Sequence, residues 1–349
     1  MKLFRNANLI DFEGETARNV DLLVDDHGKF VKIGKDLTCK CESVDLHGDY
    51  VLPPFVNAYA NSNSGVWNSY GSEMENAEKT HAHGFCKNLL AGSIIFNDSI
   101  NALALENLQD KTEQELDDLC FDLAKTSKKL FLKVGLTLEE MGAVDKEYGK
   151  SLCEDLEGFG LLDRGSVIVG GNCFEKDDLR LLANYDTKFV FLPNEDARIG
   201  RRAININTLK MLGFDCGIGS GDFVEIDFFG FMRQLLQSQR QMFESDSVLQ
   251  ESDVLKMACN GGLFGDKNKI APGENANFIV VSRDIDTNDV RKSLVWRKTK
   301  RDVVMTIYKG EILQKNGKIL MQNDEQRGKI LKELDDVVRL DITSSKLKK

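Results

Sequence analysis

The chain has few of the side chains that build the commonest transition-metal sites. Neutral imidazole is a favoured ligand of zinc and iron, yet the 349 residues contain only four histidines: His27, His47, His81 and His83. The eight cysteines are scattered, and the one close pair, Cys39 and Cys41, lacks the second pair that would complete a tetrahedral zinc site. A metal site rich in histidine or cysteine therefore has few places to form.

Other features that the sequence lacks exclude membranes, nucleic acids and export. No apolar run approaches the ~20 residues that a membrane-spanning helix needs. The 46 Lys and Arg are outnumbered by 56 Asp and Glu, and a net charge of −10 disfavours nucleic acid and anionic membrane surfaces as partners. The N-terminal run MKLFRNANLIDFEGE reaches acidic residues too early for a secretory signal. We therefore expect a cytoplasmic protein.

The residues that are present follow two patterns. From residue 53 to about 265, apolar runs such as KLFLKVGL and SVIVGG alternate with helical stretches, which is typical of parallel βα units. Both ends of the chain instead carry short β-rich runs separated by turns, of which Asn316-Gly317 is a strong hairpin signal. Residues 323–340 have an apolar stripe with a 3.6-residue period behind an Asn/Asp start, which predicts a terminal helix.

Residues 51–61, VLPPFVNAYAN, resemble the first barrel strand of the amidohydrolase superfamily. In that superfamily a Pro-Gly-aromatic-Val-Asn/Asp-Ala run ends in His-x-His, and both histidines bind a catalytic divalent metal. Here Pro54 takes the place of the glycine, and Tyr59 and Asn61 stand at the histidine positions. Tyrosine binds a metal only as a phenolate, and a neutral amide is a poor zinc ligand. The resemblance therefore implies the enzyme scaffold without its usual first pair of ligands.

Four further segments extend the resemblance over almost the whole chain: residues 127–149, 166–200, 217–222 and 260–282. The first three resemble strands whose ends carry metal ligands in the family, and the last resembles the return into a small β domain. The positions that the resemblance makes equivalent to the family's metal ligands are Tyr59, Asn61, Lys133, Gly170 and Gly221. Asp222 lies one residue beyond the aspartate position, and the alternation of side chains along a strand would turn it away from the pocket.

The resemblance implies an α/β fold with two interleaved domains. Residues 53–265 are expected to form a TIM-like (β/α) barrel, and residues 1–52 and 266–322 a small composite β-sandwich domain. A C-terminal helix and tail would occupy residues 323–349. Between Asp98 and Lys133 the sequence predicts one helical stretch where a strand and two helices are expected, which leaves open that the barrel is shortened by one βα unit.

The missing ligands predict a non-catalytic, degenerate member of the cytosine deaminase and chlorohydrolase-like branch, with a binding, regulatory or structural role. The alternative is a hydrolase or deaminase that acts on non-peptide C–N bonds through a displaced or atypical metal site. No residue is predicted as catalytic under the first hypothesis. Under the second, the candidates are Asp222 and Lys133, with Tyr59 and Glu195 as further residual candidates. We expect no cofactor, with one divalent metal such as zinc as the alternative.

The run His81-Ala82-His83 has the residues of the family's His-x-His metal signature, but its surroundings do not predict the strand conformation in which that signature binds a metal. It lies in a stretch that reads as helical, where side chains two positions apart point about 200° apart and cannot chelate together. A solvated helix face is the favoured interpretation, and a displaced metal site is the alternative. The expected partner is a small molecule or another protein, a homodimer being one option, and neither nucleic acid nor a membrane is expected.

Overall fold

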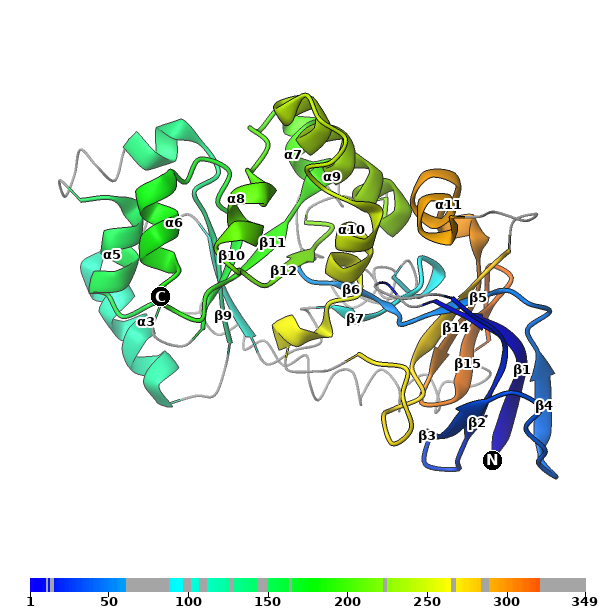
Figure 1. The fold of residues 1–349 in the computed structure, drawn as a ribbon. Helices are drawn as coiled ribbons and strands as arrows, with labels where there is room; N and C mark the ends of the chain where they lie inside the picture. The colour runs from blue at the N-terminus through cyan, green and yellow to red at the C-terminus, as the bar shows by residue number, and fades with distance from the viewer. Residues whose placement is uncertain are drawn as a thin grey trace, which may run out of the picture. The chain divides into compact units, whose positions relative to one another are not determined.

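A computed structural model shows the fold of the protein (Figure 1). The chain divides into two compact units: residues 1–57, 61–95 and 222–327 form the first, and residues 58–60, 96–221 and 328–349 the second. The structure describes residues 1–10, 12, 16–60, 88–96, 102–106, 112–125, 129–142, 150–162, 165–221, 225–264, 268–283 and 289–320.

The first unit contains a nine-stranded sheet to which both ends of the chain contribute. Its order is β16-β15-β14-β13-β5-β1-β2-β3, with β4 paired to β1. The two ends meet where β5 runs antiparallel to β13, with Val51 opposite Val280. A β-sandwich with the predicted domain bounds stays a prediction. The strands are β1 (Lys2–Leu9), β2 (Ala17–Val24), β3 (Phe30–Gly34), β4 (Glu42–Asp45), β5 (Tyr50–Leu52), β13 (Phe278–Val281), β14 (Val303–Tyr308), β15 (Glu311–Lys315) and β16 (Lys318–Ile319).

Aromatic side chains fill one face of this sheet. Phe4 and Phe278 are fully buried and meet edge to face, with ring centroids 5.0 Å apart and an interplanar angle of 89°. Phe30 packs against the same Phe278 ring at 5.9 Å. Asn316 and Gly317 both have positive φ and join β15 to β16, so the predicted hairpin turn is confirmed.

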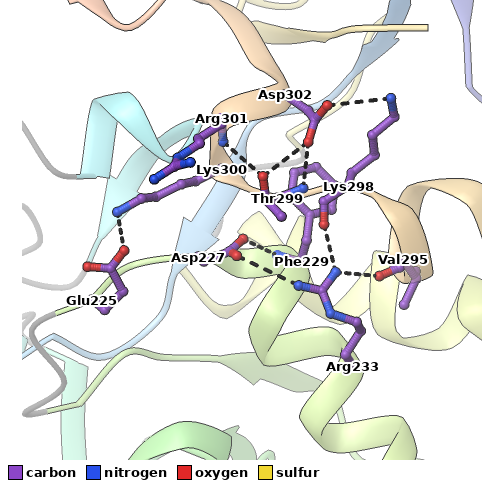
Figure 2. Close-up of polar contacts among 10 residues, drawn as sticks. All are labelled: Glu225, Asp227, Phe229, Arg233, Val295, Lys298, Thr299, Lys300, Arg301 and Asp302. Carbon is purple, nitrogen blue, oxygen red and sulfur yellow. Dashed lines mark hydrogen bonds and ion pairs between the residues drawn. The ribbon is translucent and has the colours of Figure 1, made fainter. Parts of the chain in front are cut away.

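The first unit also holds the short pair β6 (Phe55–Asn57) and β7 (Ser93–Phe96) and three longer helices, α9 (Phe228–Phe243), α10 (Glu251–Ala258) and α11 (Val290–Arg297). Asp227 caps α9 by accepting from the Phe229 N–H at 3.1 Å. Arg233 of α9 donates to the carbonyls of Val295 and Lys298 at 2.8 and 2.6 Å, which fixes α9 against the C-terminal end of α11 (Figure 2).

The second unit is built on a parallel sheet of order β12-β11-β10-β9-β8, so the predicted α/β class is confirmed. Residues 58–60 continue this parallel row beside β12, because Ala60 bridges Gly221. A closed barrel stays a prediction. The elements are β8 (Ala102–Glu106), β9 (Lys129–Val134), β10 (Val167–Gly170), β11 (Lys188–Phe191), β12 (Cys216–Ile218), α3 (Glu113–Lys125), α5 (Leu152–Gly158), α6 (Lys176–Leu182), α7 (Pro193–Ile199) and α8 (Ile206–Met211).

The stretch before Lys133 holds the strand β8 as well as the helix α3, so the expectation of one helix alone was wrong. Parallel pairing with β9 gives this segment its strand conformation, a tertiary effect that local propensity does not report. The predicted helix 323–340 lies outside the described residues. In the part of the chain that is described, no helix is both long and apolar enough to cross a membrane.

The edge-to-face pair Phe4–Phe278 provides a test of the shared sheet. We expect Phe4→Leu and Phe278→Leu each to lower the free energy of unfolding by about 1 kcal/mol. The double variant should lose about 0.5 kcal/mol less than the sum, because the aromatic contact can be lost only once. Phe189, fully buried in the second unit, is the control, and Phe4→Leu combined with Phe189→Leu should be additive. Urea denaturation measures all five variants; additivity of the Phe4 and Phe278 substitutions would contradict the shared core.

Candidate functional site

The carboxyl ends of the parallel strands gather at one edge of the sheet in the second unit. Lys133 is the penultimate residue of β9 and lies opposite Val169, and Gly170 ends β10. Gly221 follows β12 and donates its N–H to the Tyr59 carbonyl at 2.9 Å. Enzymes built on parallel (β/α) units place their active sites at this edge. Asn61 and Asp222 lie outside the described residues.

A buried carboxylate, that of Glu195, connects three of the sequence-predicted positions. Lys133 Nζ lies 3.5 Å from Glu195 Oε1, and the two side chains are 7% and 2% exposed. The same ammonium lies 5.6 Å from the centre of the Tyr59 ring. A Cβ atom at Gly221 would lie only 1.9 Å from Glu195 Oε2. Lys133 and Gly221 therefore lie beside one carboxylate, which fills the space that a side chain at Gly221 would need, and Tyr59 lies near the ammonium that pairs with it.

Helix α7 places this carboxylate. Pro193 stands in its first turn, where a missing N–H costs nothing, and Glu195 and Asp196 follow in the same turn, where the helix dipole favours negative charge. Arg201 lies just beyond the helix end, which Gly200 forms in the left-handed conformation with φ of 74°. Its Nη1 donates to Glu195 Oε1 at 2.7 Å and to Asp196 Oδ1 at 3.1 Å.

Burial and hydrogen bonding oppose each other in this cluster. Burial raises the pKa of Asp196 above its ordinary value, although hydrogen bonds from Asn172 and Arg201 work against that rise. Burial alone would lower the pKa of Arg201, but its bonds to Glu195 and Asp196 outweigh burial and raise that pKa. Two cations, Lys133 and Arg201, thus face two carboxylates, so the cluster of four is formally neutral.

The surroundings of Gly170 leave no space for a metal-ligating side chain at this position. Its φ is +100°, a conformation that favours glycine. A Cβ atom there would lie 2.2 Å from Leu136 Cδ2 and 3.2 Å from Asn172 Oδ1. Leu136 therefore occupies the volume beside this strand end. The equivalence of Tyr59, Lys133, Gly170 and Gly221 to metal ligands stays a prediction.

Sequence reasoning missed two members of the site, Asn172 and Arg201. Asn172 lies just after β10 and donates to Asp196 Oδ2 at 2.9 Å, and Arg201 belongs to the basic run Arg198 to Arg202. The signal for Arg201 was a basic run directly after an acidic helix start. The sequence offers no comparable signal for Asn172, because an asparagine after a strand is also an ordinary turn residue.

The described residues do not supply the donors of a zinc site. Among them, no group of three or more His, Cys, Asp or Glu side chains lies close enough together to hold a metal ion. His27 and His47 are exposed and belong to the first unit. His81 and His83 lie outside the described residues. At the strand ends the carboxylates of Glu195 and Asp196 already bind Arg201, and no imidazole joins them there in the described part of the chain.

Comparison with known proteins gives sequence relatives but no matching family model. A 5-methylthioadenosine/S-adenosylhomocysteine deaminase of Bacillus cytotoxicus is 24% identical over 202 residues, which cover 54% of this chain and 46% of that protein. The Bacillus cereus protein of the same name is 23% identical over 225 residues, which cover 61% of this chain and 52% of that one. The chain thus spans about half the length of the curated relatives it matches.

Solved structures share the fold over nearly the whole chain. An adenosine deaminase from Xanthomonas campestris with bound zinc has a TM-score of 0.81 at 12% identity, covering 96% of this chain and 98% of that one. The atrazine chlorohydrolase TrzN from Arthrobacter aurescens, complexed with zinc, has a TM-score of 0.74 at 14% identity and covers 97% and 100%. A guanine deaminase from C. acetobutylicum has a TM-score of 0.73 at 14% identity and covers 89% and 99%. At these identities the likeness shows the fold.

These structures correct one expectation. The prediction that the chain uses no cofactor is wrong, because the adenosine deaminase and the chlorohydrolase of the same fold contain zinc. The error came from judging cofactor use by the residues at five strand-end positions and by the number of histidines. Solved proteins of this fold thus hold a metal cofactor.

The sequence relatives are named as deaminases, and the structures that share the fold are deaminases and a chlorohydrolase. The resemblance to the amidohydrolase superfamily, first drawn from the strand-end motifs, is thereby confirmed by sequence relatives and by fold alike.

Proposed function

We propose that this chain hydrolyses a non-peptide C–N bond of a small aminated heterocycle, as a deaminase does. In such a reaction the oxygen of water bonds to the ring carbon that carries the amino group, the C–N bond breaks, and ammonia leaves with a proton from the water. The names of the relatives support this alternative better than the non-catalytic hypothesis. The chain matches only about half of the length of those relatives. That it carries out the reaction of the whole relatives is therefore itself proposed.

The observation that carries the proposal is the buried ionic cluster of Lys133, Glu195, Asp196 and Arg201. Taking charges out of water is costly, and apolar side chains of the same volume would often be as stable. Buried, mutually perturbed ionisable groups are enriched at functional sites. The cluster also lies at the edge where parallel (β/α) enzymes build their active sites.

The side chains divide the work by their chemistry. Lys133 carries three N–H donors on a flexible stem and can donate to a ring nitrogen or a carbonyl oxygen of the substrate. Glu195 holds that ammonium in place from 3.5 Å and is itself fixed by Arg201. Tyr59 and Phe131, with ring centroids 6.3 Å apart, supply an aromatic wall beside the ammonium. The donors of the described residues do not complete a zinc shell, so these roles belong to the side chains alone.

Ammonia release tests the activity. Purified protein, loaded with zinc or stripped of metal by dialysis, is incubated with aminated purines and pyrimidines. We expect turnover of at least one aminated heterocycle by the zinc-loaded protein, and a loss of about 100-fold in kcat/KM for Lys133→Ala, since one charged donor would be lost. Lys188→Ala is the matched control, because Lys188 begins β11 at the opposite edge of the same sheet. The proposal fails if the zinc-loaded protein turns over none of the panel, or if both variants are equally active.

Gly221 provides a second test of the site geometry. Gly221 and Gly213 have φ of +57° and +80°, so alanine at either position adopts a left-handed backbone that costs about 1–2 kcal/mol. At Gly213 no atom lies within 4 Å of the new methyl group, whereas at Gly221 it would meet Glu195 Oε2 at 1.9 Å. We expect both variants to have a lower melting temperature than the unmodified protein. Only Gly221→Ala should lose activity, because its methyl group displaces Glu195 from Lys133. Thermal melts and kcat/KM measure the two effects; equal activity of the variants would show that Glu195 does not need its present position.

A further inference from the structure

Cys39 and Cys41 are joined by a disulfide in the connection between β3 and β4. Only Lys40 separates them, their Cα atoms are 5.3 Å apart, and both residues are partly exposed. A disulfide stabilises a fold mainly by constraining the unfolded chain, and this effect grows with the length of the loop that the bond closes. A bond across a single residue therefore contributes little as a structural staple.

Other contacts already hold both ends of this connection. On the β3 side, the Leu37 N–H donates to Oδ2 of the buried Asp21 at 2.9 Å. On the β4 side, the chain pairs with β1 from Glu42 onward, and Glu42 Oε2 also lies 4.0 Å from Lys2 Nζ. The disulfide lies between these two fixed points, so the course of the chain there does not require a covalent bond.

The other described cysteines are poorly placed for thiol chemistry. Cys120 is partly exposed, but its thiol donates to the Phe159 carbonyl at 3.0 Å. Burial raises the pKa of the four remaining thiols, which disfavours the reactive thiolate: Cys153, Cys173, Cys216 and Cys259. Within the described ranges, Cys39 and Cys41 are thus the one cysteine pair that is both joined and reachable from solvent.

We propose that Cys39 and Cys41 form a reversible redox site that exchanges with small-molecule disulfides such as oxidised glutathione. One cysteine thiolate attacks a sulfur of the small disulfide, and one glutathione thiolate leaves. The second cysteine thiolate attacks the protein sulfur of the mixed disulfide, which closes the Cys39–Cys41 bond and releases the second glutathione. Two cysteine thiols are oxidised, one glutathione disulfide is reduced to two thiols, and the two cysteine protons pass to glutathione. The site belongs to the first unit and is independent of the proposed hydrolysis.

Strand β4 is the element that this redox site controls. It follows Cys41 directly and pairs with β1, its one partner strand in the part of the chain that is described (Figure 1). Three of its four residues are exposed, so few buried contacts hold it. Reduction opens the ring formed by residues 39–41 and gives the chain before Glu42 more conformations, which competes with the pairing of Glu42 to Lys2. The start of β4 therefore leaves β1 more often in the reduced protein.

A glutathione titration tests the redox site. The full chain is equilibrated with reduced and oxidised glutathione at a series of ratios, free thiols are alkylated, and mass spectrometry measures the disulfide fraction of the peptide containing residues 39–41. We expect this fraction to change reversibly from below about one tenth to above about nine tenths across the series. Cys41→Ser should instead retain one glutathione on Cys39, whereas the control Cys120→Ser should behave as the unmodified protein. A pair that stays reduced in excess oxidised glutathione, or oxidised in excess reduced glutathione, would overturn the proposal.

Hydrogen exchange tests the effect on β4. Residues 22–24 of β2 pair with β1 on its other side, at the same height as β4, and serve as the control. We expect the amides of residues 42–45 to exchange at least about threefold faster in the reduced protein than in the oxidised one, and those of residues 22–24 to be unchanged. Cys39→Ser combined with Cys41→Ser should match the reduced protein in either buffer. Equal exchange of residues 42–45 in both redox states would show that the disulfide does not control β4 and would overturn the switch.

Discussion

The arrangement of the strand ends depends on the buried carboxylate of Glu195. It lies 3.5 Å from the Lys133 ammonium, accepts from Arg201 at 2.7 Å, and takes the space that a side chain at Gly221 would fill. Removing either cation would leave a charge buried without compensation, which is far more costly than never having had the pair. The residue types at positions 133, 201 and 221 thus all depend on the Glu195 carboxylate: Lys133 and Arg201 balance its charge, and Gly221 leaves room for it.

The sequence predicted the parts of this arrangement that depend on local pattern. The strand ends at Lys133, Gly170 and Gly221 and the α/β class follow from apolar runs at regular spacing, and the superfamily from motifs at those ends. The sequence could not predict what fills the space left by a lost side chain. Leu136 beside Gly170 and Glu195 beside Gly221 reach those places from other elements, so only the folded chain brings them together.

The cofactor shows where such reasoning goes wrong. The count of histidines and the substituted strand ends led to the expectation of no metal, but proteins of the same fold contain zinc. Ligand identity at matched positions is a local property, whereas metal binding belongs to the assembled site and its surroundings. The arginine and the asparagine that complete the cluster were missed for the same reason: Asn172 and Arg201 gain their meaning only through the shared carboxylate of Asp196.

The pairing of β5 with β13 has a consequence for how the chain is made. A ribosome releases β1 to β5 long before β13 to β16, so during synthesis the edge of β5 presents unpaired backbone groups until the rest of the sheet arrives. Strand pairing between such distant segments is slow, because a large loop must close first. In the nascent protein the edge of β5 that pairs with β13 therefore stays open until the C-terminal strands have been made.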